Sequence, residues 1–199
     1  MITHIIFDNN GVLTTNDEER TYSRVSEFLG ISIEEEKKIL GKFVLSLDEG
    51  KITQREFYYK FLREGNLKHD IDKFAQVHLE SYIPKKEVQE FASSLKKNYS
   101  IVLLSNFGDA FWKLYPQWGL AKLILRENVF VSSDMGMAKP DEKIYLKMLN
   151  RLKVEANKCV FIDDNKDNIL TASRLGFHAL HFTQLEELKD NLRDLGVIY

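Results

Sequence analysis

Acidic, hydroxyl and ammonium side chains stand at or beyond the ends of several apolar runs in this sequence. Asp8 follows the run THIIF, Ser105 ends SIVLLS, and Asp163 with Asp164 ends CVFID. Lys139 stands in DMGMAKP, the segment after NVFVS. Three carboxylates in one place would repel one another, and a hard dication with a phosphate dianion would resolve that charge. If the fold brings these groups together, they predict a site for Mg²⁺ and a phosphoryl group.

The elements that must position these groups are short apolar runs that alternate with helices. Strands are expected at THIIF, SIVLLS, NVFVS, CVFID and FHALHF, and helices near 109–118, 141–153, 165–175 and 184–194. This alternation predicts an α/β fold with a doubly wound, parallel, five-stranded sheet. Ligands of such sheets bind beyond the carboxyl ends of the strands. The polar groups stand at those ends, so we expect them to converge.

A long stretch between the first two predicted strands has apolar residues at helical spacing. TQRE at 53–56 has the form of a helix capping box, and Pro84 precedes a helix expected from about 86 to 97. We predict an all-helical cap domain at 15–84, inserted into an α/β core domain formed by 1–14 and 85–199. The aromatic run FYYKF at 57–61 is expected to be the packed face of a cap helix.

Composition excludes several classes of protein. The 28 Lys and Arg residues nearly balance the 30 Asp and Glu residues, so no large field favours nucleic acid or an anionic membrane as partner. A small phosphorylated metabolite is the expected partner, and the oligomeric state stays open. The single cysteine, Cys159, excludes an intrachain disulfide and is expected to be a small buried hydrophobic residue. With no leader or long apolar span, a cytoplasmic protein is expected.

Four ordered motifs resemble those of the haloacid dehalogenase-like (HAD) hydrolase superfamily. They are FDNNGVLT, LLSN, GMAKPDEKIY and FIDDNKDNILTASRLG. The closing LGFHALHFTQLEELKDNL is similar to the branch that contains small sugar-phosphate phosphatases and the N-terminal phosphatase domain of soluble epoxide hydrolase. A helical cap between the first and second motifs agrees with this branch. The resemblance implies a magnesium-dependent hydrolase of small phosphomonoesters, with sugar phosphates as a candidate class.

The resemblance also implies a role for each residue that chemistry would use. Asp8 matches the nucleophile, which attacks phosphorus and forms an aspartyl-phosphate. Ser105 and the backbone N–H of Asn106 match the groups that hold phosphoryl oxygens. Lys139 matches the lysine that neutralises charge on both the nucleophile and the phosphoryl group. As a residue of a polar loop, Lys139 is expected to contribute little to packing.

The metal ligands implied by the resemblance come from the first and fourth motifs. Asp164 matches the acidic Mg²⁺ ligand, and Asp163 is expected to be a second ligand or an orienting neighbour. Asp8 and the main-chain carbonyl of Asn10 complete the set. Asn168 stands where many relatives carry a second acid, and it is expected to act through the ligands rather than to bind the metal.

Asn10 departs from the motif, because most phosphatases of the superfamily have a second Asp there as general acid and base. An amide does not transfer protons usefully near neutral pH, and such help is worth roughly 10² to 10⁴ in rate. Three explanations stay open. The substrates could have good leaving groups, such as anomeric sugar phosphates or acyl phosphates; the protein could be a weakly active or non-catalytic phosphate binder; or Asn10 could be an introduced residue.

Two other classes share part of this constellation. A 2-haloacid dehalogenase uses the same Asp nucleophile and needs no acid at position 10, but it also needs no magnesium, which argues against it given Asp163 and Asp164. A phospho-accepting receiver domain also gathers acids, a hydroxyl and a lysine around magnesium. Its paired acids come at the first strand, whereas here the pair comes at a late one.

Overall fold

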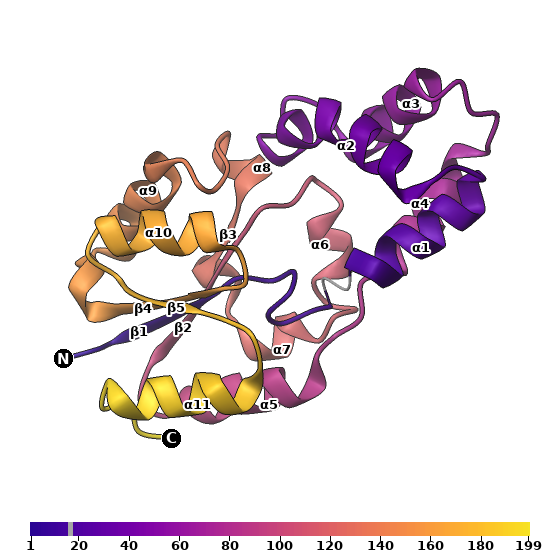
Figure 1. Ribbon diagram of the computed structural model, residues 1–199. Coiled ribbons are helices and arrows are strands. Elements are labelled where there is room, and N and C mark those ends of the chain that lie inside the picture. Colours follow the sequence, from indigo (N-terminus) through magenta and orange to yellow (C-terminus); the bar gives the residue numbers. More distant parts are fainter. Residues whose placement is uncertain (16–17) are drawn as a thin grey trace.

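The computed structural model describes residues 1–15 and 18–199, and its centre is a parallel five-stranded sheet with the order β3-β2-β1-β4-β5 (Figure 1). The predicted sheet is therefore confirmed. Its strands consist mostly of buried branched and aromatic side chains, as expected where helices cover both faces. They are β1 (His4–Phe7), β2 (Ser100–Ser105), β3 (Val129–Val131), β4 (Cys159–Asp163) and β5 (His178–His181).

Helices cover both faces of the sheet, which makes the core doubly wound (Figure 1). On one face, α5 (Lys86–Leu95) and α11 (Leu185–Asp194) pack against the side chains of alternate strand residues. On the other face, α9 (Glu142–Leu152) and α10 (Lys166–Arg174) pack against the remaining strand residues. Successive side chains of a strand point to opposite faces of the sheet, so alternate residues of each apolar run belong to two different hydrophobic clusters.

The helix expected near 109–118 is wrong in its length. The structure has two short helices instead, α6 (Phe111–Leu114) and α7 (Leu120–Leu123). Pro116 lies between them, and a proline lacks the N–H that would continue the hydrogen-bond ladder. The connection also holds a 3₁₀ turn at Arg126–Asn128 before β3 and the short α8 (Ser132–Met135) after it, and a second 3₁₀ turn, Ala156–Lys158, precedes β4. Among the described residues, no helix is both long enough and apolar enough to span a membrane.

Four helices between β1 and α5 pack around a hydrophobic cluster of their own. They are α1 (Glu18–Leu29), α2 (Ile33–Asp48), α3 (Gln54–Glu64) and α4 (Ile71–Leu79), which lie together beyond the carboxyl end of the sheet (Figure 1). The capping box at the start of α3 is confirmed, because Thr53 and Glu56 bond each other's backbone N–H. Phe57, Tyr58 and Phe61 are buried in the cluster, as expected of a packed face, whereas Tyr59 is exposed.

The chain enters and leaves this helical segment at adjacent points. The Thr15 N–H donates to the Ile83 carbonyl at 2.7 Å, and the Lys85 N–H donates to the Leu13 carbonyl at 3.0 Å. We infer from this pairing, and from the separate hydrophobic cluster, that 15–84 is a cap domain on a core formed by 1–14 and 85–199. Residues 16 and 17, at the start of that range, lie outside the described residues.

The turn between α2 and α3 lies directly on two loops of the core. The Gln54 N–H donates to the Asp109 carboxylate at 2.6 Å. A Cβ atom on Gly108 would lie 2.5 Å from a methyl carbon of Leu47, and one on Gly50 would lie 2.4 Å from the Ser133 carbonyl oxygen. Gly50 also has a φ of +67°, which few other residues adopt. These close approaches hold the end of α2 against the edge of the sheet where the polar residues gather.

Candidate active site

The parallel register brings the predicted acids together at the carboxyl end of the sheet. Phe7 pairs with Ile162 across β1 and β4, so the residues that follow, Asp8 and Asp163, lie side by side. Carboxylate oxygens of Asp8, Asp163 and Asp164 all lie within 4.8 Å of one another. Lys139 completes this group, because its Nζ donates to Asp8 Oδ1 and to Asp163 Oδ2, both at 2.7 Å.

Lys139 is not a solvated loop charge, so the expectation that it contributes little to packing is wrong. Only 4% of the residue is exposed, and its ammonium group is enclosed by the two carboxylates. The Asn106 side chain fixes the backbone of Lys139. Asn106 Oδ1 accepts from the Lys139 N–H, and Asn106 Nδ2 donates to the Lys139 carbonyl, each at 2.8 Å. This positioning contact between two motifs has no signal in the sequence.

Burial and mutual repulsion shift the proton affinities of these groups. Burial raises the pKa of Asp8 to about 8; the Lys139 ammonium acts in the opposite direction, and the Asp163 and Asp164 carboxylates add to the rise. Burial by itself lowers the pKa of Lys139, but Asp163 and Asp8 outweigh it, so its pKa is raised and it stays protonated. One ammonium group thus faces three carboxyl groups, and a further cation would reduce the repulsion among them.

Asp163 has hydrogen-bond donors on both of its oxygens. Its Oδ1 accepts from the Asn165 N–H at 2.8 Å, and Asn168 Nδ2 lies 3.1 and 3.0 Å from Oδ1 and Oδ2. Lys139 occupies the remaining side of Oδ2. Asp163 is fully buried, whereas Asp164 lines the open cavity. Of the two roles expected for Asp163, this geometry favours the orienting neighbour, with Asn168 as its support.

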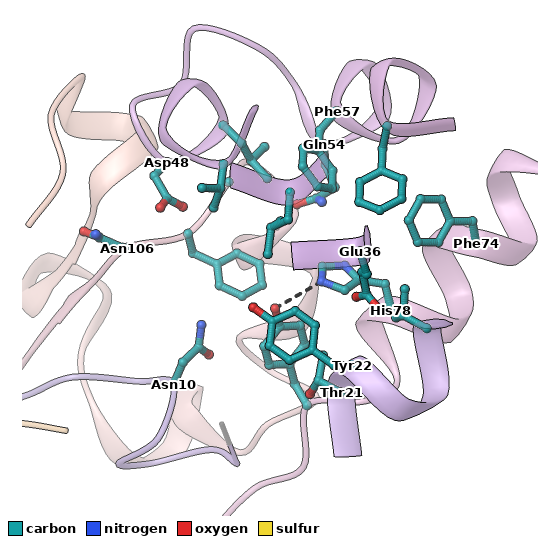
Figure 2. A pocket seen from close by; sticks show the side chains of 18 residues that line it. Asn10, Thr21, Tyr22, Glu36, Asp48, Gln54, Phe57, Phe74, His78 and Asn106 are labelled. Atoms are coloured by element: carbon teal, nitrogen blue, oxygen red, sulfur yellow. Dashed lines mark hydrogen bonds between the residues drawn. The ribbon is translucent and has the colours of Figure 1, made fainter. Parts of the chain in front are cut away.

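The loop after β1 passes so close to Asp164 that only glycine fits at position 11. A Cβ atom there would lie 1.9 Å from Asp164 Oδ2, and the φ of +89° is in the region that glycine favours. Asn10, beside it, has its side-chain oxygen fixed by two donors, Asn9 Nδ2 at 3.1 Å and Thr14 Oγ1 at 3.2 Å. Figure 2 shows the amide nitrogen of Asn10 turned toward a cavity.

Two cavities meet at this point. The first, of about 270 Å³, is lined by polar side chains that include Asp8, Lys139 and Asp164. The second, which we call the cap cavity, has a volume of about 180 Å³ and extends into the cap (Figure 2). Asn10 and Asn106 line both cavities. Near this junction Ser105 Oγ is fully buried, and no described group bonds it. Ser105 directly precedes Asn106 in the chain, and a buried hydroxyl without a partner fits a missing polar ligand.

The cap cavity contains polar residues that the sequence analysis did not select. Glu36 lies on the buried face of α2, three residues before Ile39, and Gln54 begins α3. A charged residue on the apolar stripe of an amphipathic helix was the available signal for Glu36. His78 also lines this cavity, but Tyr58 and Tyr82 hydroxyls bond its two ring nitrogens at 2.8 and 3.3 Å. Burial lowers the pKa of His78 to about 4, so the ring is neutral.

Cys159 and two histidines of β5 have structural surroundings. Cys159 is fully buried at the start of β4, as predicted, and burial raises the pKa of its thiol to about 12. His178 and His181 are the first and last residues of β5. The structure supplies partners: their Nε2 atoms bond the carbonyls of Asn157 at 3.1 Å and Asp164 at 2.9 Å.

Comparison with known proteins shows the family of this chain. The family model for haloacid dehalogenase-like hydrolases matches residues 2–176. Flavin mononucleotide hydrolase 1 of Arabidopsis thaliana is 25% identical over 195 residues, which cover 97% of this chain and 77% of the relative. The D-ribitol-5-phosphate phosphatase of Bacteroides thetaiotaomicron is 25% identical over 210 residues, covering 100% and 98%. The chain therefore belongs to the haloacid dehalogenase-like hydrolases.

Solved structures show the same fold. A HAD-like hydrolase of Porphyromonas gingivalis matches with a TM-score of 0.83 and 26% identity over 100% of both chains. A HAD family enzyme of Bacteroides thetaiotaomicron, solved with magnesium and inorganic phosphate, matches with a TM-score of 0.82 and 22% identity, covering 94% and 99%. The predicted fold, the resemblance to the phosphatase branch of this superfamily and the prediction of an enzyme are confirmed. A solved protein with the same fold as this chain therefore binds magnesium.

Proposed function

We propose that this chain hydrolyses small phosphomonoesters with the help of Mg²⁺, through an aspartyl-phosphate on Asp8. The observation that carries the proposal is the junction of the two cavities. On one side of it lie the acids and Lys139, with the orphaned hydroxyl of Ser105 nearby. On the other side lies space for an alcohol group. A phosphomonoester that spans the junction would have its scissile P–O bond beside Asn10 and Asn106.

The donor set fits a magnesium ion. Carboxylate and carbonyl oxygens are its preferred ligands, and three carboxyl groups face one ammonium group. We assign the ion to Asp8, Asp164 and the main-chain carbonyl of Asn10, with Asp163 and Asn168 orienting the neighbouring groups. When bound, Mg²⁺ would neutralise charge on the phosphoryl oxygens and keep Asp8 ionised. The close approach of Gly11 to Asp164 supports this, because it brings the backbone of the loop that carries Asn10 next to the Asp164 carboxylate.

The residues of the chain account for the rest of the reaction. An Asp8 carboxylate oxygen attacks phosphorus, and the P–O bond to the alcohol breaks. Lys139, Ser105 and the backbone N–H of Asn106 would bind the phosphoryl oxygens, whose charge is largest during the transfer. Water then attacks phosphorus in the aspartyl-phosphate, which releases inorganic phosphate and restores Asp8.

Asn10 can assist the leaving oxygen only by donating a hydrogen bond. Its Oδ1 accepts hydrogen bonds from Asn9 and Thr14, and its Nδ2 is turned toward the cap cavity (Figure 2). An amide donates without giving up its proton, so the alkoxide must take its proton from water. This arrangement supports catalysis that is slow with poor leaving groups rather than a protein that only binds phosphate. The three carboxyl groups in one site also favour a phosphatase over a dehalogenase, which needs no metal.

The relatives narrow the substrate class. Flavin mononucleotide and D-ribitol 5-phosphate, the compounds in the relatives' names, are both phosphate esters of a hydroxylated carbon chain. We propose a small phosphorylated metabolite of this general kind, with sugar phosphates included. The test is a metal-dependent screen of phosphorylated metabolites with the unaltered protein, Asp8→Ala, and the exposed Asp167→Asn as control. Hydrolysis that persists in excess chelator or in Asp8→Ala, or its absence for every ester in the screen, would refute the proposal.

A further inference from the structure

The cap cavity has features that go beyond a generic space for a leaving group. Aromatic and branched side chains make up much of its wall, among them Phe57, Phe74 and Phe107. Glu36 and Gln54 are two of the polar side chains that interrupt this wall (Figure 2). Glu36 is 4% exposed and Gln54 is 7% exposed, yet Glu36 Oε2 and Gln54 Nε2 have no hydrogen-bond partner among the described residues. A buried polar atom without a partner costs free energy, so both atoms indicate a ligand with hydroxyl groups.

The charge of the cavity is one-sided. Its titratable lining groups are Glu36, Asp48, His78 and two tyrosines, and no lysine or arginine lines it within the described ranges. His78 is held neutral by burial. A second phosphate or a carboxylate on the substrate would therefore be buried with no described lysine or arginine lining the cavity to pair with it, which is strongly unfavourable. Uncharged hydroxyl groups have no such cost.

The volume sets a limit on size. A cavity of 150 Å³ in another protein holds benzene, so about 180 Å³ holds a group somewhat larger than benzene. The end of α2 and the turn after it lie in close contact with the core at Gly50 and Gly108, so the cavity has little room to widen on that side. A short polyhydroxylated chain fits this volume, whereas a three-ring system does not.

We propose that the cap cavity binds the alcohol half of the phosphomonoester, and that Glu36 selects a short, hydroxylated, uncharged alcohol half and rejects one with a second anionic group. This inference rests on the proposed function for the placement of the phosphoryl group at Asp8. It adds the substrate class and the specificity-determining residue. Gln54 supplies the complementary donor from the opposite helix.

The test measures binding rather than turnover. Asp8→Asn, which lacks the nucleophile, is titrated in a calorimeter with Mg²⁺ and four probes: inorganic phosphate, pentyl phosphate, a pentitol 5-phosphate and the corresponding pentonate 5-phosphate. These esters share chain length and differ in hydroxyl groups or in one carboxylate. We expect the pentitol phosphate to bind at least tenfold more tightly than the pentonate phosphate, and more tightly than pentyl phosphate.

Variants in the Asp8→Asn background assign the selection to Glu36. Glu36→Leu should weaken the pentitol phosphate by about five- to tenfold, the effect of one hydrogen bond, without weakening pentyl phosphate. At pH 9, where Glu36 is ionised, Glu36→Gln should reduce discrimination against the pentonate by at least threefold. The same changes at Glu35, one residue away and exposed, are the matched controls and should alter neither ratio.

The outcomes separate this inference from the proposed function. Equal affinity for the pentitol and pentonate phosphates, or a Glu36→Leu change that weakens all probes equally, would overturn the inference while the phosphate site stands. If inorganic phosphate does not bind to the unaltered protein in the presence of Mg²⁺, the phosphoryl site itself is wrong and both proposals fall. If the probes bind as expected but the unaltered protein hydrolyses none of them, the inference stands as a binding site and the phosphatase proposal fails.

Discussion

Replacing Lys139 by alanine should destabilise the fold as well as the site. Its ammonium group bonds Asp8 and Asp163 at 2.7 Å each, and the three side chains are 1%, 9% and 0% exposed. Lys139→Ala would leave two buried carboxylates without their cation. Breaking a buried ion pair by removing one partner costs about 3 to 5 kcal/mol, because the remaining charge stays out of water.

The corresponding change in melting temperature is large enough to measure. A chain of 199 residues has an unfolding entropy of about 0.4 kcal/mol per kelvin. The expected loss is therefore about 7 to 12 °C in buffer with a chelator. Added Mg²⁺ should reduce this deficit, because it supplies a cation to the same carboxylates. Differential scanning calorimetry with and without the metal measures both effects.

The matched control is Lys143→Ala, in the same segment of the chain. Its side chain is 78% exposed, and its ion-pair partner, Asp141, lies 3.9 Å away. Exposed pairs contribute less than about 1 kcal/mol, so the control should shift the melting temperature by no more than about 2 °C. Adding Asp163→Asn to Lys139→Ala should restore part of the loss, since one unpaired charge is removed. A Lys139→Ala protein as stable as the control would refute the buried ion-pair argument.

Three further predictions concern the loop after β1 and the cap. Asn10→Asp should raise turnover of alkyl phosphates by up to about 10²-fold and of aryl phosphates less, because a carboxylic acid can protonate a basic leaving group; an unchanged slope of rate against leaving-group pKa would contradict this. Gly11→Ala should weaken Mg²⁺ binding in a calorimetric titration by about tenfold or more, because its Cβ displaces Asp164, and unchanged affinity would exclude that carboxylate as a ligand. Burial raises the pKa of Glu36 from 4.5 to about 8, so the folded state holds this proton more tightly and stability falls as pH rises between these values. Glu36→Gln should therefore gain stability relative to the unaltered protein as pH rises from 5 to 8 in denaturant titrations, and a constant difference would show that Glu36 titrates normally.

The sequence alone determined the sheet and the residues at its carboxyl end. Buried parallel strands are continuous apolar runs, and these are visible without any partner. The residues at the carboxyl ends of parallel strands must lie at one edge of the sheet, so Asp8, Ser105 and Asp163 could be placed together from their order. The capping box at Thr53 was equally local, because it depends on contacts three residues apart.

What the sequence could not show depended on contacts between distant segments. The burial of Lys139 between Asp8 and Asp163, and its support by Asn106, join residues from all four motifs, and a polar loop sequence does not reveal that it folds inward. The helix expected at 109–118 was interrupted because a proline outweighed its apolar spacing.

The cap cavity was the least accessible feature from sequence. Glu36 and Gln54 belong to different helices and become neighbours of Asn10 only when the cap lies on the core. Helical periodicity predicts that a side chain is buried, but not which surface it meets. Sequence order thus determined the place for the chemistry, and packing of the cap determined the space in which a substrate must fit.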